Sequence, residues 1–319
     1  MKITFKDVGQ GDSIIIEWSD NGVNRIGIID CNKKGGTNPV VEHIQQLQCS
    51  EIEFIILSHP HSDHYSGFLE LFYYLENNNI CINHFGHSFS TISVEYWKWF
   101  EVTSSESKNL SEIIHKANQL RALGILKKFF LVTEHVKLPI NGIEISTLSP
   151  SHAELEIYQN QVKFDAIVNK KQASKAANYL SSLFYIKKGD STVLLTSDVE
   201  KNTFDRIHND GSLNDHLFCL CQAPHHGSYN NYHDIFWDNL KTIDVKNVVF
   251  SSGINEKYKH PHLITVNSFV NNGYGINPTN LVYGIQEFLD EIDSKTLILD
   301  SISEIDEESI TGGDKVFTF

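Results

Sequence analysis

The segment His59–His64, with the sequence HPHSDH, gathers side chains that can bind metal ions. Side chains two positions apart on an extended backbone point in the same direction, so His59 and His61 can converge on one ion. Asp63 and His64 follow directly and can reach a neighbouring ion. Imidazole and carboxylate ligands together suit zinc, and also manganese or iron. The competing interpretation is a His-rich surface loop, which is disfavoured because the cluster is dense and directly follows an apolar strand.

Three other apolar segments also end in side chains that can bind metals. Asp30 follows the run IGII, Asp198 follows VLLTS, and the pair His225 and His226 follows LFCLCQAP. Each has an ordinary explanation on its own, because an aspartate after a strand often caps a helix or turn and a histidine pair can belong to a loop. Metal sites are assembled from distant strand ends at one edge of a sheet, so the recurrence of this pattern favours one shared site.

The elements that must position these residues are predicted from apolar runs and turn signals. The sequence DNG at 20–22 predicts a hairpin turn between two strands. Helices are expected over Val40–Gln48, Gly67–Leu75 and Leu263–Val270. Strands are expected over Ile3–Phe5, Ser13–Trp18, Val23–Ile29, Glu53–Leu57, Phe129–Val132, Ile143–Leu148, Leu183–Ile186, Thr192–Leu195, Leu217–Cys221 and Val248–Phe250, with a last one ending at Val316–Phe319. Strands alternating with helices predict a layered α/β domain.

The chain is expected to form a single domain over residues 1–319, a length that suits one large α/β domain. Residues 87–124 are polar and aromatic, and they predict a helical insertion that is helical from about Ser93 onward. Residues 151–178 are rich in Lys, Gln and Ala, and they predict a mobile segment.

The charge and cysteine content exclude some classes of protein. With 26 basic and 40 acidic residues the net charge is −14, which argues against strong non-specific binding to duplex nucleic acid. The five cysteines are odd in number and form no CxxC pair, which favours a reducing cytoplasm without disulfides. The N-terminus lacks the apolar core of a signal peptide, and no apolar run approaches the roughly 20 residues that span a bilayer. A soluble, cytoplasmic protein without membrane association is therefore expected.

In the order and content of its motifs the chain resembles the metallo-β-lactamase superfamily, and within it the ComEC/Rec2-type competence hydrolase domain. The matching segments are DVGQGDS at 7–13, the strand ending at Asp30, SHPHSDH at 58–64, LLTSD at 194–198, APHHGS at 223–228 and YKHPH at 258–262. The resemblance implies an α/β fold of the αββα four-layer sandwich type, with two sheets between helical layers and the metals at one edge.

The resemblance also implies roles for individual residues. His59 and His61 resemble the ligands of a first metal ion, whereas Asp63 and His64 resemble those of a second. Asp198 resembles the carboxylate that bridges both ions. The implied cofactors are therefore two divalent ions, zinc first, with manganese as the alternative.

Some positions stay open at this stage. One of His225 and His226 resembles the last histidine ligand of the second metal, and the sequence does not distinguish which ring faces the ion. Asp30 resembles an aspartate that orients the histidine loop from outside the metal's own ligand set. The histidine that most superfamily members add to the first metal has no clear match here. The candidates are His152 and Asn178, although His152 is more typical of a residue at the surface start of a helix.

The activity implied is that of a metal-dependent hydrolase, a phosphodiesterase or nuclease that uses a metal-activated hydroxide on a nucleotide or short nucleic-acid substrate. Asp63, His64 and Asp198 are the candidate catalytic residues. His260 and Ser228 are the candidate substrate-binding residues, and Ser228 is not expected to act as a nucleophile.

Two alternatives use the same residues. The first is hydrolysis of an ester, lactam or thioester, in which the ions polarise a carbonyl group. The second is a metal-stabilised, non-catalytic effector or binding subunit that acts with a protein partner. The aromatic stretch YWKWF at 96–100 is the candidate interface for that partner, although aromatic clusters pack in cores more often.

Overall fold

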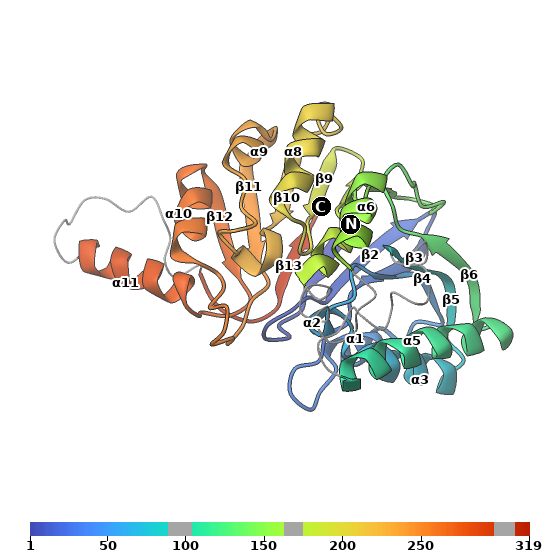
Figure 1. Cartoon of the computed structure of the whole chain (residues 1–319). Helices are drawn as coiled ribbons and strands as arrows, with labels where there is room; N and C mark the ends of the chain where they lie inside the picture. Colours follow the sequence, from blue (N-terminus) through green and yellow to red (C-terminus); the bar gives the residue numbers. More distant parts are fainter. Residues whose placement is uncertain (89–103, 163–174, 297–309) are drawn as a thin grey trace.

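The computed structural model of the chain describes residues 1–88, 104–162, 175–296 and 310–319 (Figure 1). Two mixed sheets carry the fold. The first has the strand order β13-β1-β2-β3-β4-β5-β6. Its strands are β1 (Lys2–Phe5), β2 (Ile14–Asp20), β3 (Val23–Ile29), β4 (Glu51–Leu57), β5 (Cys81–His87), β6 (Leu126–Leu131) and β13 (Lys315–Thr318). The strands from β3 to β6 run parallel, and the others pair antiparallel.

The second sheet has the order β12-β11-β10-β9-β8-β7. Its strands are β7 (Glu144–Thr147), β8 (Phe184–Lys188), β9 (Ser191–Leu195), β10 (Phe218–Gln222), β11 (Thr242–Phe250) and β12 (Tyr274–Pro278). Here the strands from β9 to β12 run parallel. Each sheet therefore has a parallel half, and the carboxyl ends of parallel strands are where open α/β sheets place their binding sites.

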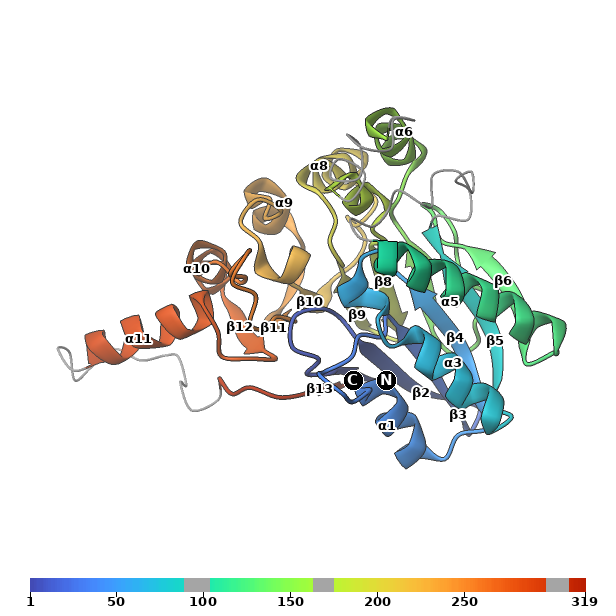
Figure 2. The same ribbon diagram turned by 60° about the horizontal axis from the view of Figure 1, so that its bottom comes forward.

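Helices cover the outer faces of both sheets (Figures 1 and 2). On the first sheet lie α1 (Pro39–Leu47), α3 (Phe68–Asn77) and α5 (Ser104–Ala122). On the second lie α8 (Lys201–Asp210), α9 (Asp234–Asn239), α10 (Leu263–Asn271) and α11 (Gly284–Thr296). The remaining helical elements are α2 (Ser62–Tyr65), α6 (His152–Gln161) and the short 3-10 turns η2 (Ala177–Leu180) and η3 (Pro224–Gly227). Among the described residues, no helix is long and apolar enough to cross a membrane.

Three apolar cores separate the four layers. Strand β4 illustrates the arrangement, because its side chains alternate between the two faces of the sheet. Phe54 and Ile56 are buried in the core between the two sheets, whereas Ile55 and Leu57 are buried under α1, α3 and α5. A third core fills the space between the second sheet and its helices. The αββα sandwich that the resemblance implies is thus confirmed.

Within the expected helical insertion over residues 87–124, the described residues 104–122 form helix α5. Strand β5 already occupies Cys81–His87, in the middle of the parallel half of the first sheet, and the sequence analysis did not anticipate it. Helix α5 covers Ser104–Ala122 and buries Leu110, Ile113 and Leu120 in the core against this sheet. This helix therefore forms part of the helical layer on the first sheet. Residues 89–103, with the YWKWF stretch, lie outside the described residues.

The segment 151–178 contains a well-formed helix start. Ser151 caps α6 by accepting a hydrogen bond from the backbone N–H of Glu154, and the Glu154 side chain accepts one from the backbone N–H of Ser151. This reciprocal pair satisfies two N–H groups at the start of the helix. Residues 163–174, the middle of the predicted mobile segment, lie outside the described residues.

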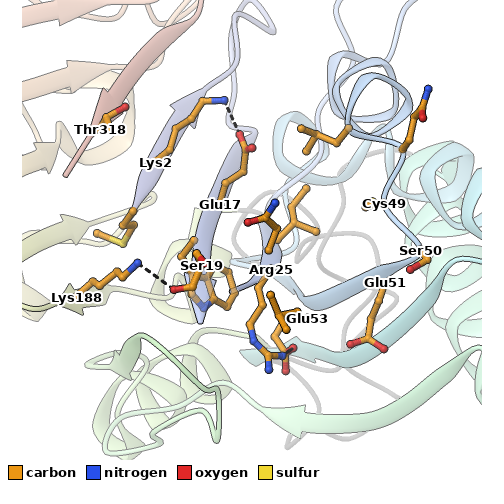
Figure 3. A pocket seen from close by; sticks show the side chains of 17 residues that line it. Lys2, Glu17, Ser19, Arg25, Cys49, Ser50, Glu51, Glu53, Lys188 and Thr318 are labelled. Atoms are coloured by element: carbon orange, nitrogen blue, oxygen red, sulfur yellow. Dashed lines mark hydrogen bonds and ion pairs between the residues drawn. The ribbon is translucent and has the colours of Figure 1, made fainter. Parts of the chain in front are cut away.

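A cavity of about 730 Å³ opens at the other end of the first sheet, where β4 begins (Figure 3). Its charged side chains pair with one another: Lys2 lies 2.7 Å from Glu17, and Arg25 lies 2.6 Å from Glu53. The residues with metal-binding side chains follow the opposite, carboxyl end of β4. The cavity is therefore separate from the candidate site.

Candidate metal centre

The carboxyl end of β4 delivers the histidine cluster. After Leu57 the backbone passes directly through His59, whose side chain is fully buried, and α2 begins at Ser62 with His61 as its N-cap residue. Helix α2 then carries Asp63 and His64, and His64 is fully buried as well. The Nε2 atom of His59 lies 3.0 Å from Nδ1 of His61, which is a hydrogen-bond distance, so the two rings contact each other directly. The structure therefore brings together the side chains that the sequence groups.

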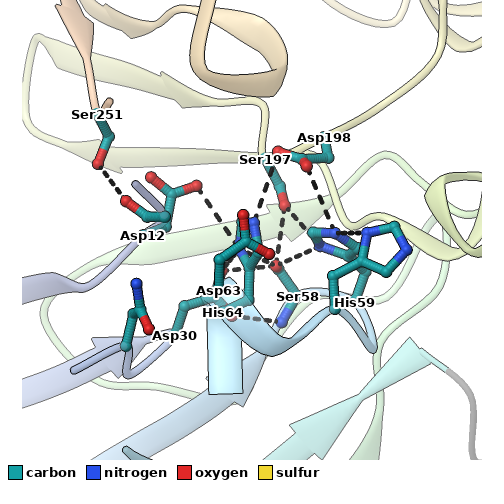
Figure 4. A network of polar contacts seen from close by, with 12 residues as sticks. Asp12, Asp30, Ser58, His59, Asp63, His64, Ser197, Asp198 and Ser251 are labelled. Carbon is teal, nitrogen blue, oxygen red and sulfur yellow. Dashed lines mark hydrogen bonds and ion pairs between the residues drawn. The ribbon is translucent and has the colours of Figure 1, made fainter. Parts of the chain in front are cut away.

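Asp198 follows the carboxyl end of β9 and lies beside His59 (Figure 4). The loop that carries it is held by Gln222, whose Oε1 accepts hydrogen bonds from the backbone N–H groups of Thr196 and Ser197, both at 3.0 Å. The two carboxylate oxygens of Asp198 face different rings. Its Oδ2 lies 3.6 Å from Nε2 of His59, and its Oδ1 lies 3.6 Å from Nε2 of His64. Asp198 is thus placed between two groups of ligands.

The pair His225 and His226 approaches Asp198 from the end of β10, in the turn η3. Nε2 of His226 lies 3.5 Å from Oδ1 of Asp198 and 3.4 Å from Oδ2 of Asp63. Nε2 of His225 lies 3.5 Å from Oδ2 of Asp198. Burial lowers the pKa of His225 to about 4, so its ring is neutral at neutral pH and can bind a metal.

These separations fit shared metal ions better than direct hydrogen bonds. The N···O distances of 3.4 to 3.6 Å are longer than the usual N–H···O bond. Two ligand atoms that each lie about 2.1 Å from one tetrahedral zinc ion are about 3.4 Å apart. Three buried atoms at this centre, Nε2 of His64, Nε2 of His226 and Oδ1 of Asp198, have no hydrogen-bond partner among the described residues. A cation between them would satisfy all three.

In the buried rings of His64 and His226, the nitrogen that points away from Asp198 is held by a hydrogen-bond acceptor. Nδ1 of His64 lies 2.8 Å from Oδ2 of Asp30, and Nδ1 of His226 lies 2.8 Å from the carbonyl oxygen of Ser251. Carboxylate and carbonyl oxygens only accept, so Nδ1 carries the hydrogen in both rings. When the rings are neutral, Nε2 is left with its lone pair directed at Asp198. This is how proteins orient histidines that bind metals.

His59 follows the same rule through two serines. The Ser197 hydroxyl donates to the Ser58 hydroxyl at 2.8 Å, and the Ser58 hydroxyl donates to Asp30 at 2.6 Å. Both hydroxyl hydrogens are used, so both oxygens can only accept from Nδ1 of His59, at 3.2 and 3.3 Å. Asp30 is therefore the last acceptor in a chain of hydrogen bonds that begins at the Ser197 hydroxyl, beside His59. Its Oδ1 also accepts the backbone N–H of Ser58 at 2.7 Å.

The carboxylates of the cluster stabilise positive charge. Burial lowers the pKa of His226, but Asp198 and Asp63 outweigh burial and raise this pKa to about 9. For His64 burial also opposes the charged form, and the neighbouring carboxylates again raise the pKa well above its ordinary value. Burial alone would raise the pKa of Asp198, yet the surrounding histidines hold it well below its usual range. Positive charge is favoured here, whether protons or a divalent ion carry it.

The two candidates for the additional first-metal ligand occupy different positions. His152 is the first residue of α6 and its side chain is exposed, so the structure does not bring it to the cluster. Asn178 lies in η2 and is buried beside the cluster, with its Nδ2 atom 3.4 Å from Nδ1 of His225.

The candidate substrate-binding residues also lie near the histidine pair. His260 is buried, with its ring centroid 5.3 Å from that of His225. Burial lowers the pKa of His260 to about 3, so this ring is neutral. Ser228 is buried immediately after η3, where its backbone N–H donates to the carbonyl of His225.

The structure adds residues to which the sequence analysis gave no role. Asp12 is buried beside the centre: its Oδ2 accepts a hydrogen bond from Nε2 of Gln222 at 2.8 Å and lies 3.6 Å from Nδ1 of His64. Gly11 precedes it, and a Cβ at this position would lie 2.1 Å from the carbonyl oxygen of Asp63. The DVGQGDS motif could have indicated both residues, because it is part of the resemblance. The link from Asp12 to Gln222 spans 210 positions, and no local pattern reveals it.

Comparison with known proteins gives structural similarity without sequence similarity. No protein-family model matches the sequence, and no curated protein matches it either. Among solved structures, the metallo-β-lactamase fold protein YhfI from Bacillus subtilis is 9% identical with a TM-score of 0.48, covering 87% of this chain and 95% of its own. Zinc-bound PqqB from Methylobacterium extorquens is 10% identical with a TM-score of 0.44, covering 86% and 97%. The long form of RNase Z from yeast is 11% identical with a TM-score of 0.43, covering 82% and 38%. At such low identities and TM-scores, none of these matches carries an argument about activity.

Proposed function

We propose that this chain is a metal-dependent hydrolase of the metallo-β-lactamase type that binds two divalent ions. The single observation that carries the proposal is the position of Asp198, whose two oxygens each face ring nitrogens at the spacing of shared metal ligands. Zinc is the first choice, since the ligand atoms are imidazole nitrogens and carboxylate oxygens, and manganese is the alternative.

In this proposal the ligands divide into two groups that share Asp198. His59 and His61 belong to the first ion in this proposal, because the two residues are neighbours whose rings lie in contact, with Nε2 of His59 3.0 Å from Nδ1 of His61. Asp63 and His64 belong to the second ion. His226 joins this second group, because its Nε2 lies 3.4 Å from the carboxylate of Asp63. This assigns His226 to the position that the resemblance leaves open between the two histidines.

The residues around the ions have their own tasks in hydrolysis. Bound divalent ions would supply Lewis acidity and a water of lowered pKa, the two requirements for attack on a phosphodiester or an ester. About a third of the Asp63 side chain is exposed, whereas Asp198 is almost fully buried. Partial burial acts to raise the pKa of Asp63, but the neighbouring histidines, His226 first, hold this pKa below the usual range. Asp63 is therefore ionised and can orient a water molecule by accepting its hydrogen. Asp30 holds His64 in the tautomer that binds metal.

The proposed substrate is a phosphodiester in a nucleotide or a short nucleic acid. The order of the motifs from residue 7 to 262, which resembles the competence-type hydrolases, supports this choice. The net charge of −14 favours a short, single-stranded or cyclic substrate over long duplex. The neutral ring of His260 lies beside the centre, and its Nδ1 has no partner among the described residues, so it is the candidate contact for a phosphate oxygen.

The test is hydrolysis of bis(p-nitrophenyl) phosphate by metal-free protein to which zinc or manganese is restored. We expect activity that depends on the added metal and falls at least about 1,000-fold in Asp198→Asn. His152→Ala, whose side chain lies in solvent, should match the wild type. Cleavage of p-nitrophenyl acetate or of a lactam with the diester left intact would replace the phosphodiesterase by the carbonyl hydrolase. Metal binding without either activity would favour the non-catalytic effector.

A further inference from the structure

Two tyrosines with exposed rings lie beside the candidate metal centre. Tyr229 is 42% exposed and follows η3, the turn that carries His225 and His226. Tyr258 is 49% exposed and lies two positions before the buried His260. Proteins that bind single-stranded nucleic acids use exposed aromatic rings of this kind to stack the bases. The two tyrosines can therefore contact a part of the substrate that metal ions do not reach.

Ring contacts connect Tyr258 to the metal centre. Its ring stacks on that of His260, with centroids 5.8 Å apart and an angle of 24° between the planes. The ring of His260 packs edge-on against that of His225, with centroids 5.3 Å apart. Nε2 of His225 in turn lies 3.5 Å from Oδ2 of Asp198. A base that extended this stack beyond Tyr258 would belong to a nucleotide close to the phosphate at the centre.

Hydrogen bonds fix the backbone that presents both tyrosines. The backbone N–H of Tyr229 donates to Nδ1 of His262 at 3.0 Å. In the other loop, Oδ1 of Asn255 accepts hydrogen bonds from the backbone N–H groups of Lys257 and Tyr258, at 3.2 and 3.3 Å. A surface that is already ordered loses little conformational entropy when a ligand binds to it. The rings are thus presented by backbone that is held in place.

A lysine lies over each of the two rings. Nζ of Lys201 lies 5.0 Å from the centroid of the Tyr229 ring. Nζ of Lys257 lies 4.4 Å from the centroid of the Tyr258 ring and donates to its hydroxyl oxygen at 2.6 Å. Neither ammonium group has a carboxylate partner among the described residues. On a chain with a net charge of −14, unpaired positive charge at this place favours an anionic ligand.

A stacked base can displace these lysines at little cost. The contact between a lysine and an exposed ring is weaker than the stacking of a base on that ring. The lysine side chain is long and flexible, so a displaced ammonium group can turn towards a phosphate beside the base. Residues 254–259 contain a further exposed lysine, Lys259, against one acidic residue, Glu256. Aromatic rings with positive charge beside them are the features that recognise an unpaired strand.

A contact between a lysine and a tyrosine does not by itself mark a binding site. Nζ of Lys116 lies 4.3 Å from the centroid of the Tyr73 ring, and Tyr73 is 48% exposed. This pair belongs to α3 and α5, in the helical layer on the first sheet. Tyr229 and Tyr258 differ from Tyr73 because their hydrogen bonds and ring contacts join them to the loops beside the metal centre. Tyr73 is therefore a matched control.

We propose that Tyr229 and Tyr258 form a stacking platform for the bases of a short single-stranded nucleic acid, and that Lys201 and Lys257 contact its phosphates. The proposal rests on the phosphodiesterase function proposed above and specifies its substrate as an unpaired strand of two or more nucleotides. The bases of a duplex already stack on and pair with one another, so these rings cannot reach them. Because every base has an aromatic face, we expect little preference for sequence.

The experiment compares two fluorescent single strands of the same length and charge, one of thymidine nucleotides and one of abasic sites. Binding is measured by fluorescence anisotropy with metal-free protein, so that neither strand is cleaved. We expect the wild type to bind the thymidine strand at least about 10-fold more tightly than the abasic strand. Tyr229→Leu and Tyr258→Leu should each lower this ratio roughly 3- to 10-fold. Tyr229→Phe and Tyr258→Phe keep an aromatic face and should preserve it, and Tyr73→Leu should match the wild type.

Substitution of the lysines tests the phosphate contacts separately. Lys201→Gln and Lys257→Gln should weaken binding of the thymidine and abasic strands alike, because both strands carry the same phosphates. Each substitution should also lower the slope of log affinity against log salt concentration by about 0.7, as expected for one lost phosphate contact with a single strand. Thermal unfolding verifies that every variant is folded.

The outcomes distinguish this proposal from the proposed function. If the wild type binds the two strands equally or binds neither, the stacking platform is refuted, whereas metal-dependent diester hydrolysis is measured independently and can still hold. The platform is also refuted if Tyr229→Leu and Tyr258→Leu change the ratio no more than Tyr73→Leu does, or if a duplex binds as tightly as the single strand. If binding depends on the tyrosines but no diester is cleaved with metal present, the platform holds and the hydrolase proposal fails.

Discussion

Nδ1 of His226 lies 2.8 Å from the backbone carbonyl oxygen of Ser251. This contact joins the ends of two parallel strands, β10 and β11, and it fixes which nitrogen of the ring carries hydrogen. The opposite nitrogen, Nε2, is buried and faces Asp63 and Asp198. Backbone geometry that the sheet determines therefore prepares the ring to hold either a proton or a metal ion between two carboxylates.

Without metal, the stability of the protein should depend on the proton of His226. Its pKa in the folded protein is about 9, above the ordinary value of 6.5. A group with a raised pKa stabilises the fold fully below pH 6.5 and loses this contribution as the pH rises through about 9. We expect the free energy of unfolding of metal-free wild type to fall by roughly 3 kcal/mol more over this window than that of His226→Asn. Urea unfolding at several pH values measures the difference.

Metal binding should reverse this trend, because the ion displaces the proton. With saturating zinc, the wild type should become more stable relative to its metal-free form as the pH rises from 6.5 to 9. In the metal-free state, the free energy of unfolding should depend on pH more steeply in the wild type than in His226→Asn. An equal dependence on pH in the two proteins would mean that His226 holds no stabilising proton between the carboxylates.

Asp30→Asn should weaken metal binding while the fold is retained. Oδ2 of Asp30 accepts hydrogen bonds from Nδ1 of His64 and from the Ser58 hydroxyl. An amide NH2 in that place favours the other tautomer of His64, in which Nε2 carries the hydrogen and cannot bind metal. We expect the affinity for one of the two ions to fall roughly 10–100-fold. Zinc titration against a competing chelator measures it, with the exposed Asp215→Asn as the control. Unchanged affinity would show that Asp30 does not set the tautomer.

Gln222→Met should destabilise the protein itself. The Gln222 side chain accepts from the N–H groups of Thr196 and Ser197 and donates to Asp12, all in the buried interior. Each of the three buried polar groups left without its partner costs about 1–3 kcal/mol, so we expect a loss of roughly 3–9 kcal/mol in the free energy of unfolding. The exposed Gln119→Met should change it by less than about 0.5 kcal/mol. If Gln222→Met lowered the free energy of unfolding as little as the control does, the three hydrogen bonds of Gln222 would not stabilise the fold.

Gly11→Ala should disturb both stability and metal binding. The φ of Gly11 is 120°, and a Cβ there would lie 2.1 Å from the carbonyl oxygen of Asp63. Either this loop or the start of α2 must move, and α2 carries Asp63 and His64. We expect more than about 3 kcal/mol of destabilisation, measured by urea unfolding. Gly36→Ala is the matched control because nothing lies within 4 Å of its Cβ position, and it should behave like wild type.

Much of the fold and the set of candidate ligands follow from local patterns. Alternating or continuous apolar runs predict most strands. The end of each run also marks where a strand ends, so a polar residue that follows it directly is identified as a candidate ligand. His59, Asp198 and the histidine pair were found in this way, and the parallel halves of the two sheets then explain why these residues meet. Strand β5 was missed because its sequence, CINHFGH, mixes polar and apolar residues without a strict alternation.

The perpendicular orientation of the His225 and His226 rings could not be read from the sequence. It depends on two consecutive left-handed residues, which have no reliable signal when neither is glycine. The roles of Asp12 and Gln222 depend on a contact between the two halves of the sandwich. Such contacts arise from how the sheets pack, and they are determined only when the whole fold is assembled.

Metal content is the measurement that tests the central claim most directly. The protein is purified without added metal, stripped with a chelator, reloaded with zinc or manganese and analysed for bound metal and for diester hydrolysis. We predict two ions per chain in the reloaded protein, about one in His226→Asn, and diester cleavage only when metal is present. A reloaded wild type that is folded, contains no metal and shows no metal-dependent activity would contradict it.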